Sequence, residues 1–230
     1  MRVILFGASG MVGQAVLREC LRDSEIDSVL AIGRSAAGLG DPKLRDIVRQ
    51  DLSGLSDIED VLRPYDACLF CLGVSSAGMS EQEYRRITYD LTLSVAQTLV
   101  RANPNMTFIY VSGTGTDSTE QGRTMWARVK GATENALLRL PFKAAYMFRP
   151  GFIQPLDGIK SKTKLYSALY AVARPLYPLI RAIVPDYATT TQELARAMIG
   201  VAKDGYSKPV LEGRDMRDYA RDTSRKNTAP

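Results

Sequence analysis

Three glycines near the start of the chain have the spacing and the surroundings of a phosphate-binding turn. Gly7, Gly10 and Gly13 directly follow the apolar run of residues 3–6, and a helical pattern of apolar residues begins at Val12. In such a unit the first glycine permits the sharp turn, the second lets backbone approach a phosphate, and the third lets the helix pack on the strand. Amides at the helix N-terminus then face the anion. This context predicts a dinucleotide site, the alternative being a plain tight turn.

Residues at the ends of further apolar runs extend the predicted dinucleotide site. Arg34 and Ser35 follow a run at residues 28–33, where an acidic residue favours NAD and an arginine accommodates the 2′-phosphate of NADP. No acid stands there, so we expect NADP(H), with NAD(H) and a merely solvated arginine as the alternatives. Asp51 is a candidate contact to the base but is equally suited to cap a turn. The other expected cofactor contacts are Ser9, Met11, Val12, Leu52, Cys71, Leu72, Gly73, Pro150 and Gly151.

Strand and helix patterns alternate along the whole chain. The predicted strands after the first are residues 28–33, 46–51, 67–72, 107–112, 144–148 and 209–212. Amphipathic patterns lie between them, and Ser80 with Glu83 has the spacing of a capping box before a long helix. Such alternation predicts an α/β fold, a doubly wound parallel sheet that binds ligands at the carboxyl ends of its strands. We expect a single Rossmann-like domain over residues 1–230.

The complete absence of histidine excludes several classes of chemistry. It removes Ser-His-Asp hydrolysis, Cys-His catalysis, histidine-dependent dehydrogenases and most zinc sites, and we expect no metal centre. Cys68 and Cys71 have C-x-x-C spacing within a predicted strand, which puts them on opposite faces and about 10 Å apart. A disulfide requires Cα atoms closer than about 7 Å, so we interpret the pair as core cysteines.

Charge and cysteine content bear on partners and compartment. The formal net charge of +5 fits an anionic ligand such as a phosphorylated cofactor, and we expect no nucleic-acid partner. Three cysteines are too few for a disulfide framework, and the first strand begins at once, which leaves no room for a signal peptide. We therefore expect a cytoplasmic protein.

A basic stretch late in the chain has two interpretations. Residues 158–185 contain no acidic side chain, and lysines and arginines alternate with tyrosines there. We expect residues 152–186 to form a mostly helical lobe on the substrate side; the alternative is peripheral contact of residues 160–181 with an anionic membrane. Prolines and charges exclude a membrane span in this stretch. Residues 213–230 are polar, and we expect a solvated or frayed tail.

Several of the residues singled out so far, with three more, resemble those of atypical or extended short-chain dehydrogenase/reductases. The matching residues are Gly7-x-x-Gly10-x-x-Gly13, Arg34, Ser112, Lys130 and Arg149-Pro150-Gly151. The resemblance covers almost the whole chain. Residues 129–136 and 148–151 are more closely similar to a compact NADP-binding branch, which includes Tat-interacting oxidoreductase-like proteins and bacterial epimerase/dehydratase-like proteins.

This resemblance implies roles for three positions. In the family a Ser or Thr after the fifth strand binds the substrate oxygen, and a Tyr transfers the proton. A Lys four residues later binds the nicotinamide ribose and lowers the tyrosine pKa. By position Ser112 and Lys130 take the first and third roles, and Trp126 stands where the tyrosine is expected. An indole N–H donates a hydrogen bond but is no usable acid near neutral pH.

Three functions remain open from the sequence. One is an NADP-dependent oxidoreductase or sugar-nucleotide epimerase-like enzyme with a substitute acid, such as Thr114, Thr116, Tyr84 or a water held by Ser112. The second is an NADP(H)-sensing module that responds by binding a partner, and the third is a reductase of a substrate that needs little acid help, such as a quinone. The sequence does not identify the small-molecule substrate. It also leaves the oligomeric state open, a homo-oligomer included.

Overall fold

The structure, a computed structural model, describes residues 1–156 and 185–226 of the 230-residue chain. Its main element is a sheet of seven parallel strands in the order β3-β2-β1-β4-β5-β6-β9. The strands are β1 (Arg2–Phe6), β2 (Ser28–Gly33), β3 (Leu44–Val48), β4 (Ala67–Phe70), β5 (Thr107–Val111), β6 (Ala144–Arg149) and β9 (Val210–Glu212). The predicted α/β fold with a doubly wound parallel sheet is confirmed.

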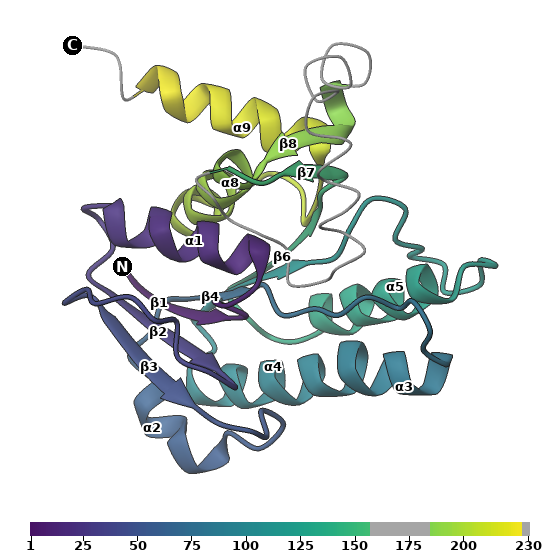
Figure 1. Cartoon of the computed structure of the whole chain (residues 1–230), viewed down its shortest axis with the longest axis horizontal. Helices are drawn as coiled ribbons and strands as arrows, with labels where there is room; N and C mark the ends of the chain where they lie inside the picture. Colours follow the sequence, from purple (N-terminus) through teal and green to yellow (C-terminus); the bar gives the residue numbers. More distant parts are fainter. Residues whose placement is uncertain (157–184, 227–230) are drawn as a thin grey trace.

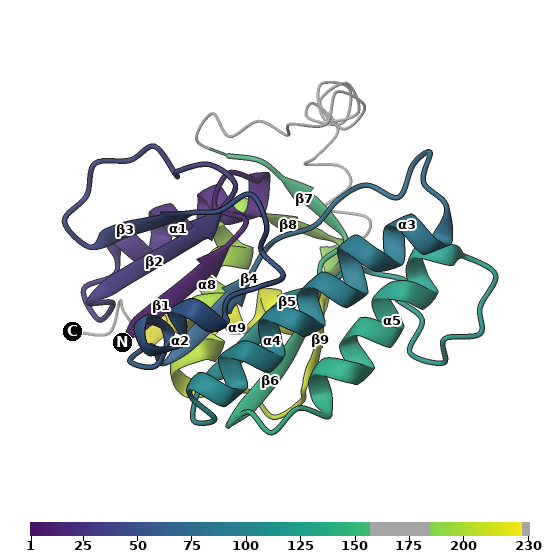
Figure 2. The same ribbon diagram turned by 90° about the horizontal axis from the view of Figure 1, so that it is seen from below.

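Helices cover both faces of this sheet (Figure 1). One face carries α1 (Met11–Arg22), α8 (Thr191–Asp204) and α9 (Gly213–Lys226). The other face, seen from below in Figure 2, carries α2 (Glu59–Leu62), α3 (Glu81–Arg85), α4 (Leu91–Ala102) and α5 (Met125–Leu138). The shorter elements are η1 (Ser56–Ile58), η2 (Arg86–Asp90), η3 (Pro185–Tyr187) and a parallel pair, β7 (Phe152–Gln154) with β8 (Ala188–Thr190). No helix in the described ranges is long and apolar enough to cross a membrane.

Alternate residues of β1 build the core on both sides of the sheet. Val3 and Leu5 belong to the cluster beneath α1 and α8, whereas Ile4 and Phe6 belong to the cluster beneath α4. All four side chains are fully buried. A central parallel strand is covered on both faces, and for this reason its sequence is continuously apolar.

The cysteines follow the same two-sided arrangement. Cys68 faces the α4 side of the sheet and Cys71 the α1 side, and both are free thiols, as is Cys20. The predicted placement on opposite faces is confirmed, and Cys68 is a core cysteine, whereas Cys71 is only partly buried.

The strand order changes direction at β1 and β4, and this creates the crevice in which the fold binds ligands. Strands β2 and β3 lie on one side of β1, whereas β4, β5 and β6 lie on the other. The chain leaves β1 towards α1 on one face and leaves β4 towards α3 and α4 on the opposite face. A crevice forms between such diverging connections, at the carboxyl ends of the strands.

Two predicted element boundaries can be compared directly with the structure. Ser80 and Glu83 form the predicted capping box, and the long helix that they begin contains the π-helical turn η2 between α3 and α4. The third strand comprises Leu44–Val48 instead of the predicted residues 46–51. Pairing with β2 fixes this edge strand, because Leu44 lies opposite Val29 and the pairing ends at Val48.

The predicted frayed tail after residue 212 is wrong for the part that the structure describes. Residues 213–226 form α9, and its Met216 is fully buried in the cluster that includes α8. A Cβ on Gly200 of α8 would lie 2.3 Å from the Tyr219 ring, so this glycine makes room for the packed helix. Most residues of α9 are charged or polar, so its composition did not indicate that a few apolar residues on one side would pack against the protein.

Residues 157–184 lie outside the described part of the chain. They include the basic segment 160–181 and most of the lobe predicted at 152–186. The lobe and the membrane contact therefore stay predictions. Described residues on either side of this stretch form β7 and β8, which pair with each other.

Candidate functional site

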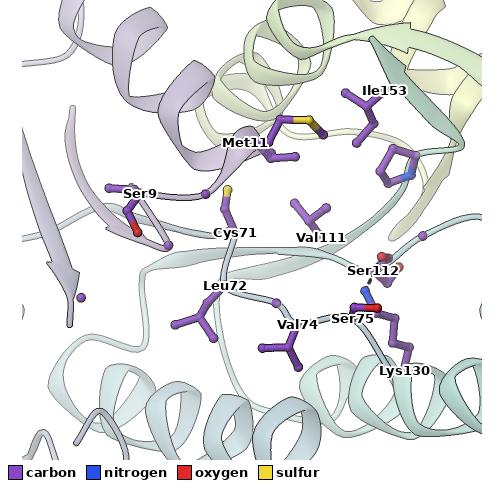
Figure 3. A pocket seen from close by; sticks show the side chains of 18 of the residues that line it. Ser9, Met11, Cys71, Leu72, Val74, Ser75, Val111, Ser112, Lys130 and Ile153 are labelled. Atoms are coloured by element: carbon purple, nitrogen blue, oxygen red, sulfur yellow. Dashed lines mark hydrogen bonds between the residues drawn. The ribbon is translucent and has the colours of Figure 1, made fainter. Parts of the chain in front are cut away.

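A large pocket lies at the carboxyl ends of β1, β2, β4, β5 and β6. Its volume is about 930 Å³, within the range of roughly 300–1,000 Å³ that is usual for ligand sites. Figure 3 shows Ser9, Met11 and Cys71 towards one end and Ser112 with Lys130 towards the other. The predicted site residues that line it are Gly7, Ser9, Gly10, Met11, Val12, Arg34, Ser35, Leu52, Cys71, Leu72, Gly73, Ser112, Lys130, Pro150 and Gly151. Gly13, Asp51 and Trp126 do not line this pocket.

Gly7 and Gly13 allow α1 to lie directly against the end of β1. Gly7 has a φ of +81°, and a Cβ there would lie 2.7 Å from the Cys71 carbonyl carbon. A Cβ on Gly13 would lie 2.0 Å from the Gly7 carbonyl oxygen. Side chains at these positions would force the helix and the turn apart. Gly13 thus does not line the pocket itself, but it permits the close contact between α1 and the turn that forms the pocket wall.

The N-terminus of α1 presents its positive end to the pocket. Gly10 is the N-cap residue and no side chain caps the helix. The first turn contains no acidic residue, and Gly10, Met11 and Val12 line the pocket. The Gly10 amide donates to the Gly7 carbonyl oxygen at 2.9 Å. Amides in the first helical turn have no intrahelical acceptor, so those of Met11 and Val12 are suited to bind a phosphate.

Arg34 lies at the adenosine-side end expected for this fold, directly after β2. Its side chain is exposed and lines the pocket beside Gly33 and Ser35. Within residues 1–156 and 185–226 it makes no hydrogen bond and no ion pair. A free guanidinium at this edge is available to bind a phosphate in a bidentate manner.

Asp51 has a local partner instead of a position in the pocket wall. Its carboxylate accepts hydrogen bonds from the backbone N–H and the hydroxyl of Ser53, at 2.8 and 2.7 Å. The hydroxyl and the amide of Ser53 lower the pKa of this carboxyl. The structure thus favours the turn-cap interpretation of Asp51, while its neighbour Leu52 is buried and lines the pocket.

Backbone packing positions the segments after β4 and β6. The Cys71 amide donates to the Phe6 carbonyl oxygen at 3.0 Å, and burial raises the pKa of the Cys71 thiol. After β6, the Pro150 carbonyl accepts a hydrogen bond from the Thr114 amide at 2.9 Å. A Cβ on Gly151 would lie 2.5 Å from the Tyr187 carbonyl oxygen, so the backbone after β6 passes close to the backbone at Tyr187.

Ser112 and Lys130 meet at the far end of the pocket (Figure 3). The Lys130 ammonium donates a hydrogen bond to the Ser112 carbonyl oxygen. Its Nζ lies 6.0 Å from the centroid of the Tyr110 ring. Burial lowers the pKa of Lys130 to about 8, and the charge of Glu134 partly opposes this shift. The far end of the pocket therefore contains an ammonium group that releases its proton more readily than an ordinary lysine.

Trp126 lines a second, smaller cavity that adjoins the first. This cavity has a volume of about 210 Å³, and Tyr84 lies in its wall with Trp126. Ser112 and Lys130 line both cavities. One turn of α5 separates Trp126 from Lys130, and the loop residue Gly115 faces the indole, with 3.6 Å from its ideal Cβ position to the ring. The aromatic side chain thus borders the space beside Ser112 but not the large pocket.

A buried ion pair behind Ser112 was missed by the sequence analysis. Glu134 is 1% exposed, and Arg149 Nε donates to its two carboxylate oxygens at 3.0 and 3.1 Å. The Ser112 hydroxyl donates to Glu134 Oε1 at 2.5 Å. Arg149 was noted only as part of the Arg-Pro-Gly match. Nothing in the local sequence pairs it with a residue fifteen positions earlier on the preceding helix.

The chain is similar over nearly its full length to a fungal protein. It is 25% identical over 219 residues to "Protein fmp52-2, mitochondrial" of Aspergillus terreus, with 94% of each protein covered. It is also 26% identical over 153 residues to Protein HTATIP2 of Rattus norvegicus, which covers 66% of this chain and 62% of that protein.

The expected cytoplasmic location is overturned by these names, because the Aspergillus protein and other fungal relatives are designated mitochondrial. The number of cysteines separates oxidising from reducing compartments, but it does not separate the cytosol from an organelle.

Solved structures and a family model agree on the fold. Candida albicans Gre2 in complex with NADPH superimposes with a TM-score of 0.68 at 15% identity, covering 92% of this chain and 78% of that one. The model of the NAD dependent epimerase/dehydratase family matches residues 3–124, more than half of the chain. The chain therefore belongs to the NAD dependent epimerase/dehydratase family and is an atypical short-chain dehydrogenase/reductase with an NAD(P)-binding Rossmann fold.

Proposed function

We propose that this protein is an NADP(H)-dependent reductase of a small carbonyl compound. One observation carries the proposal: a single pocket of about 930 Å³ joins Arg34 at one end to Ser112 and Lys130 at the other. A dinucleotide is long enough to need both ends, and the residues present suit its parts in order along the pocket. This arrangement supports a function that uses the reactive end of the cofactor.

The phosphate-binding part fits the pyrophosphate because two glycines bring the uncapped N-terminus of α1 to the pocket wall. Amides of Met11 and Val12 would hold the pyrophosphate there. Arg34 and Ser35 would bind a 2′-phosphate, which supports NADP(H) over NAD(H). Arg34 has no competing partner in the described part of the chain, so its charge is free for this contact.

At the other end Lys130 would hold the nicotinamide ribose, and Ser112 would orient a substrate oxygen. The reduced nicotinamide supplies a hydride when it is bound. The Ser112 hydroxyl has one proton, which it donates to Glu134 in this structure; to bind a substrate carbonyl oxygen, which only accepts, the hydroxyl would turn this proton towards the substrate. Lys130, fixed by the Ser112 carbonyl, contributes a positive charge beside the site where negative charge develops on a carbonyl oxygen.

Trp126 supports a second candidate function, an NADP(H) sensor without catalysis. An indole replaces the tyrosine expected four residues before Lys130 and gives no proton near neutral pH. A protein of this kind would bind the cofactor with the same residues and change its contacts with a partner. Turnover of a carbonyl compound separates the two functions.

The single tryptophan of the chain provides a direct test of the cofactor assignment. Trp126 emission overlaps the absorption of reduced nicotinamide, so titration with NADPH and NADH measures each Kd through quenching. We expect NADPH to bind at least about tenfold more tightly than NADH. In Arg34→Ala, we expect the Kd of NADPH to rise about 10- to 100-fold, because charge-assisted hydrogen bonds to the 2′-phosphate are lost. The Kd of NADH should change little.

Arg45→Ala is a matched control, because Arg45 is exposed on the edge strand β3 and does not line the pocket. Equal losses of NADPH and NADH affinity in Arg34→Ala would refute the NADP(H) preference. Absence of quenching by both cofactors in the wild type would refute the proposed function itself.

A further inference from the structure

Few groups at the far end of the pocket can release a proton. The titratable side chains that line the two cavities within the described residues are Arg34, Cys71, Tyr84 and Lys130. Arg34 follows β2 at the other end, and Cys71 lies beside Met11, away from Ser112 (Figure 3). Tyr84 and Lys130 are thus the titratable groups beside Ser112.

Three hydroxyl groups in this part of the site donate to backbone or carboxylate acceptors. Thr114 Oγ1 donates to the Arg149 carbonyl oxygen at 3.0 Å, and Thr116 Oγ1 donates to the Gly113 carbonyl oxygen at 2.7 Å. Ser112 Oγ donates to Glu134. These threonines are therefore poor substitutes for the missing tyrosine, because each would have to give up its present hydrogen bond.

Lys130 differs from these hydroxyl groups because not all of its ammonium N–H groups are used in hydrogen bonds within the described residues. Its hydrogen-bond acceptor within the described residues is the Ser112 carbonyl oxygen, which uses one of three N–H groups. The nearby carboxylate, Glu134, is held by Arg149 and by the Ser112 hydroxyl. The Lys130 ammonium is therefore partly buried and forms no ion pair within the described residues, although the charge of Glu134 still acts on it.

We propose that Lys130 itself donates the proton in the reduction, in place of the tyrosine that Trp126 replaces. This inference rests on the proposed function. The carbonyl carbon accepts a hydride from NADPH, which becomes NADP⁺, and the C=O π pair moves onto oxygen. That oxygen accepts a proton from Lys130 Nζ, so the carbonyl compound becomes an alcohol. The neutral amine then takes a proton from water.

The surroundings of Lys130 suit a proton donor near neutral pH. The titratable groups on the elements around it are Tyr84 on α3, Tyr110 on β5, Glu134 on α5 and Arg149 on β6. Burial outweighs the charge of Glu134 and lowers the pKa of Lys130 to about 8. A donor whose pKa is close to the working pH is largely protonated and also releases its proton readily, which is the optimum for general acid catalysis.

The first measurement is independent of turnover. In full-length protein labelled with ¹³C at lysine Cε and saturated with NADP⁺, NMR titration from about pH 6 to about pH 11 follows each lysine. The Lys130 signal is the one absent from Lys130→Arg. We expect it to titrate near pH 8, and the signal of exposed Lys143 serves as the internal reference.

The second measurement separates the charge of Lys130 from its acidity. With NADPH and a panel of benzaldehydes and quinones, we expect wild-type kcat to be constant below about pH 8 and to fall above it, since only the protonated amine donates. An arginine keeps the charge but not the acidity. Lys130→Arg should lower kcat at least about 100-fold, with the Kd of NADPH within about fivefold by Trp126 quenching. Lys143→Arg should change neither quantity.

Three outcomes would overturn the inference while leaving NADPH binding intact. They are titration of Lys130 above about pH 10, turnover retained by Lys130→Arg but lost in Tyr84→Phe, and a wild-type protein that reduces no compound of the panel. The last result would favour the sensor function. Failure of the wild type to bind NADPH would instead refute the proposed function.

Discussion

The charged residues at the far end of the pocket differ in their pairing: Glu134 and Arg149 form an ion pair behind the pocket wall, whereas Lys130 lines the pocket. Glu134 and Arg149 neutralise each other in the interior, and Glu134 also holds the Ser112 hydroxyl. Lys130, one helical turn before Glu134, therefore remains an ammonium without an ion-pair partner in the described part of the chain. The buried ion pair thus holds the Ser112 hydroxyl and occupies the carboxylate nearest Lys130, while burial lowers the pKa of Lys130.

Removal of Glu134 should be costly because it leaves the largely buried Arg149 guanidinium with the exposed Glu212 as its remaining carboxylate partner within the described residues. We expect Glu134→Ala to lower the free energy of unfolding by about 3–5 kcal/mol, measured by urea denaturation. Glu212→Ala is the matched control: Glu212 lies 3.4 Å from Arg149 Nη1, but its side chain is 49% exposed, against 1% for Glu134. Its loss should cost less than about 1 kcal/mol. Similar losses in both variants would contradict the structural role given to the buried pair.

At the scale of elements, the contact between β1 and α1 decides whether the pocket can bind a phosphate. The ideal Cβ of residue 13 lies 2.0 Å from the Gly7 carbonyl oxygen, so any side chain there displaces the start of α1. We expect Gly13→Ala to raise the Kd of NADPH at least about tenfold and to destabilise the fold by about 1–3 kcal/mol, as overpacking does.

Gly54→Ala serves as the control for this element, because a Cβ on Gly54 meets nothing within 4 Å. The measurements are Trp126 quenching for binding and urea denaturation for stability. A Gly13→Ala protein that binds NADPH like the wild type would show that the close contact of strand and helix is not needed for the site.

Sequence reasoning succeeded for elements that local patterns define. The glycine turn, the strand at 28–33 and the capping box of Ser80 with Glu83 each lie within a few consecutive residues, and the structure has all three. It failed where tertiary contacts decide. The pairing of Glu134 with Arg149 depends on how α5 packs against β6, and the order of α9 depends on its packing against α8. The position of Asp51 depends on a turn with Ser53 that competes with the pocket.

At the scale of the whole molecule, the parallel sheet gathers distant segments at one edge. Residues from the ends of five strands meet there, although more than a hundred positions separate Gly7 from Pro150. The alternation of strand and helix made this convergence predictable from the sequence, since carboxyl ends of parallel strands share one edge. The compartment was not predictable in the same way, because no feature of the fold depends on it.

The most direct test of the account is a crystal structure of the protein grown with saturating NADP⁺. We expect the 2′-phosphate against Arg34, the pyrophosphate at the N-terminus of α1, and the nicotinamide ring beside Ser112 and Lys130. A pocket without the dinucleotide, or a dinucleotide whose 2′-phosphate lies away from Arg34 and whose nicotinamide lies away from Lys130, would contradict the account.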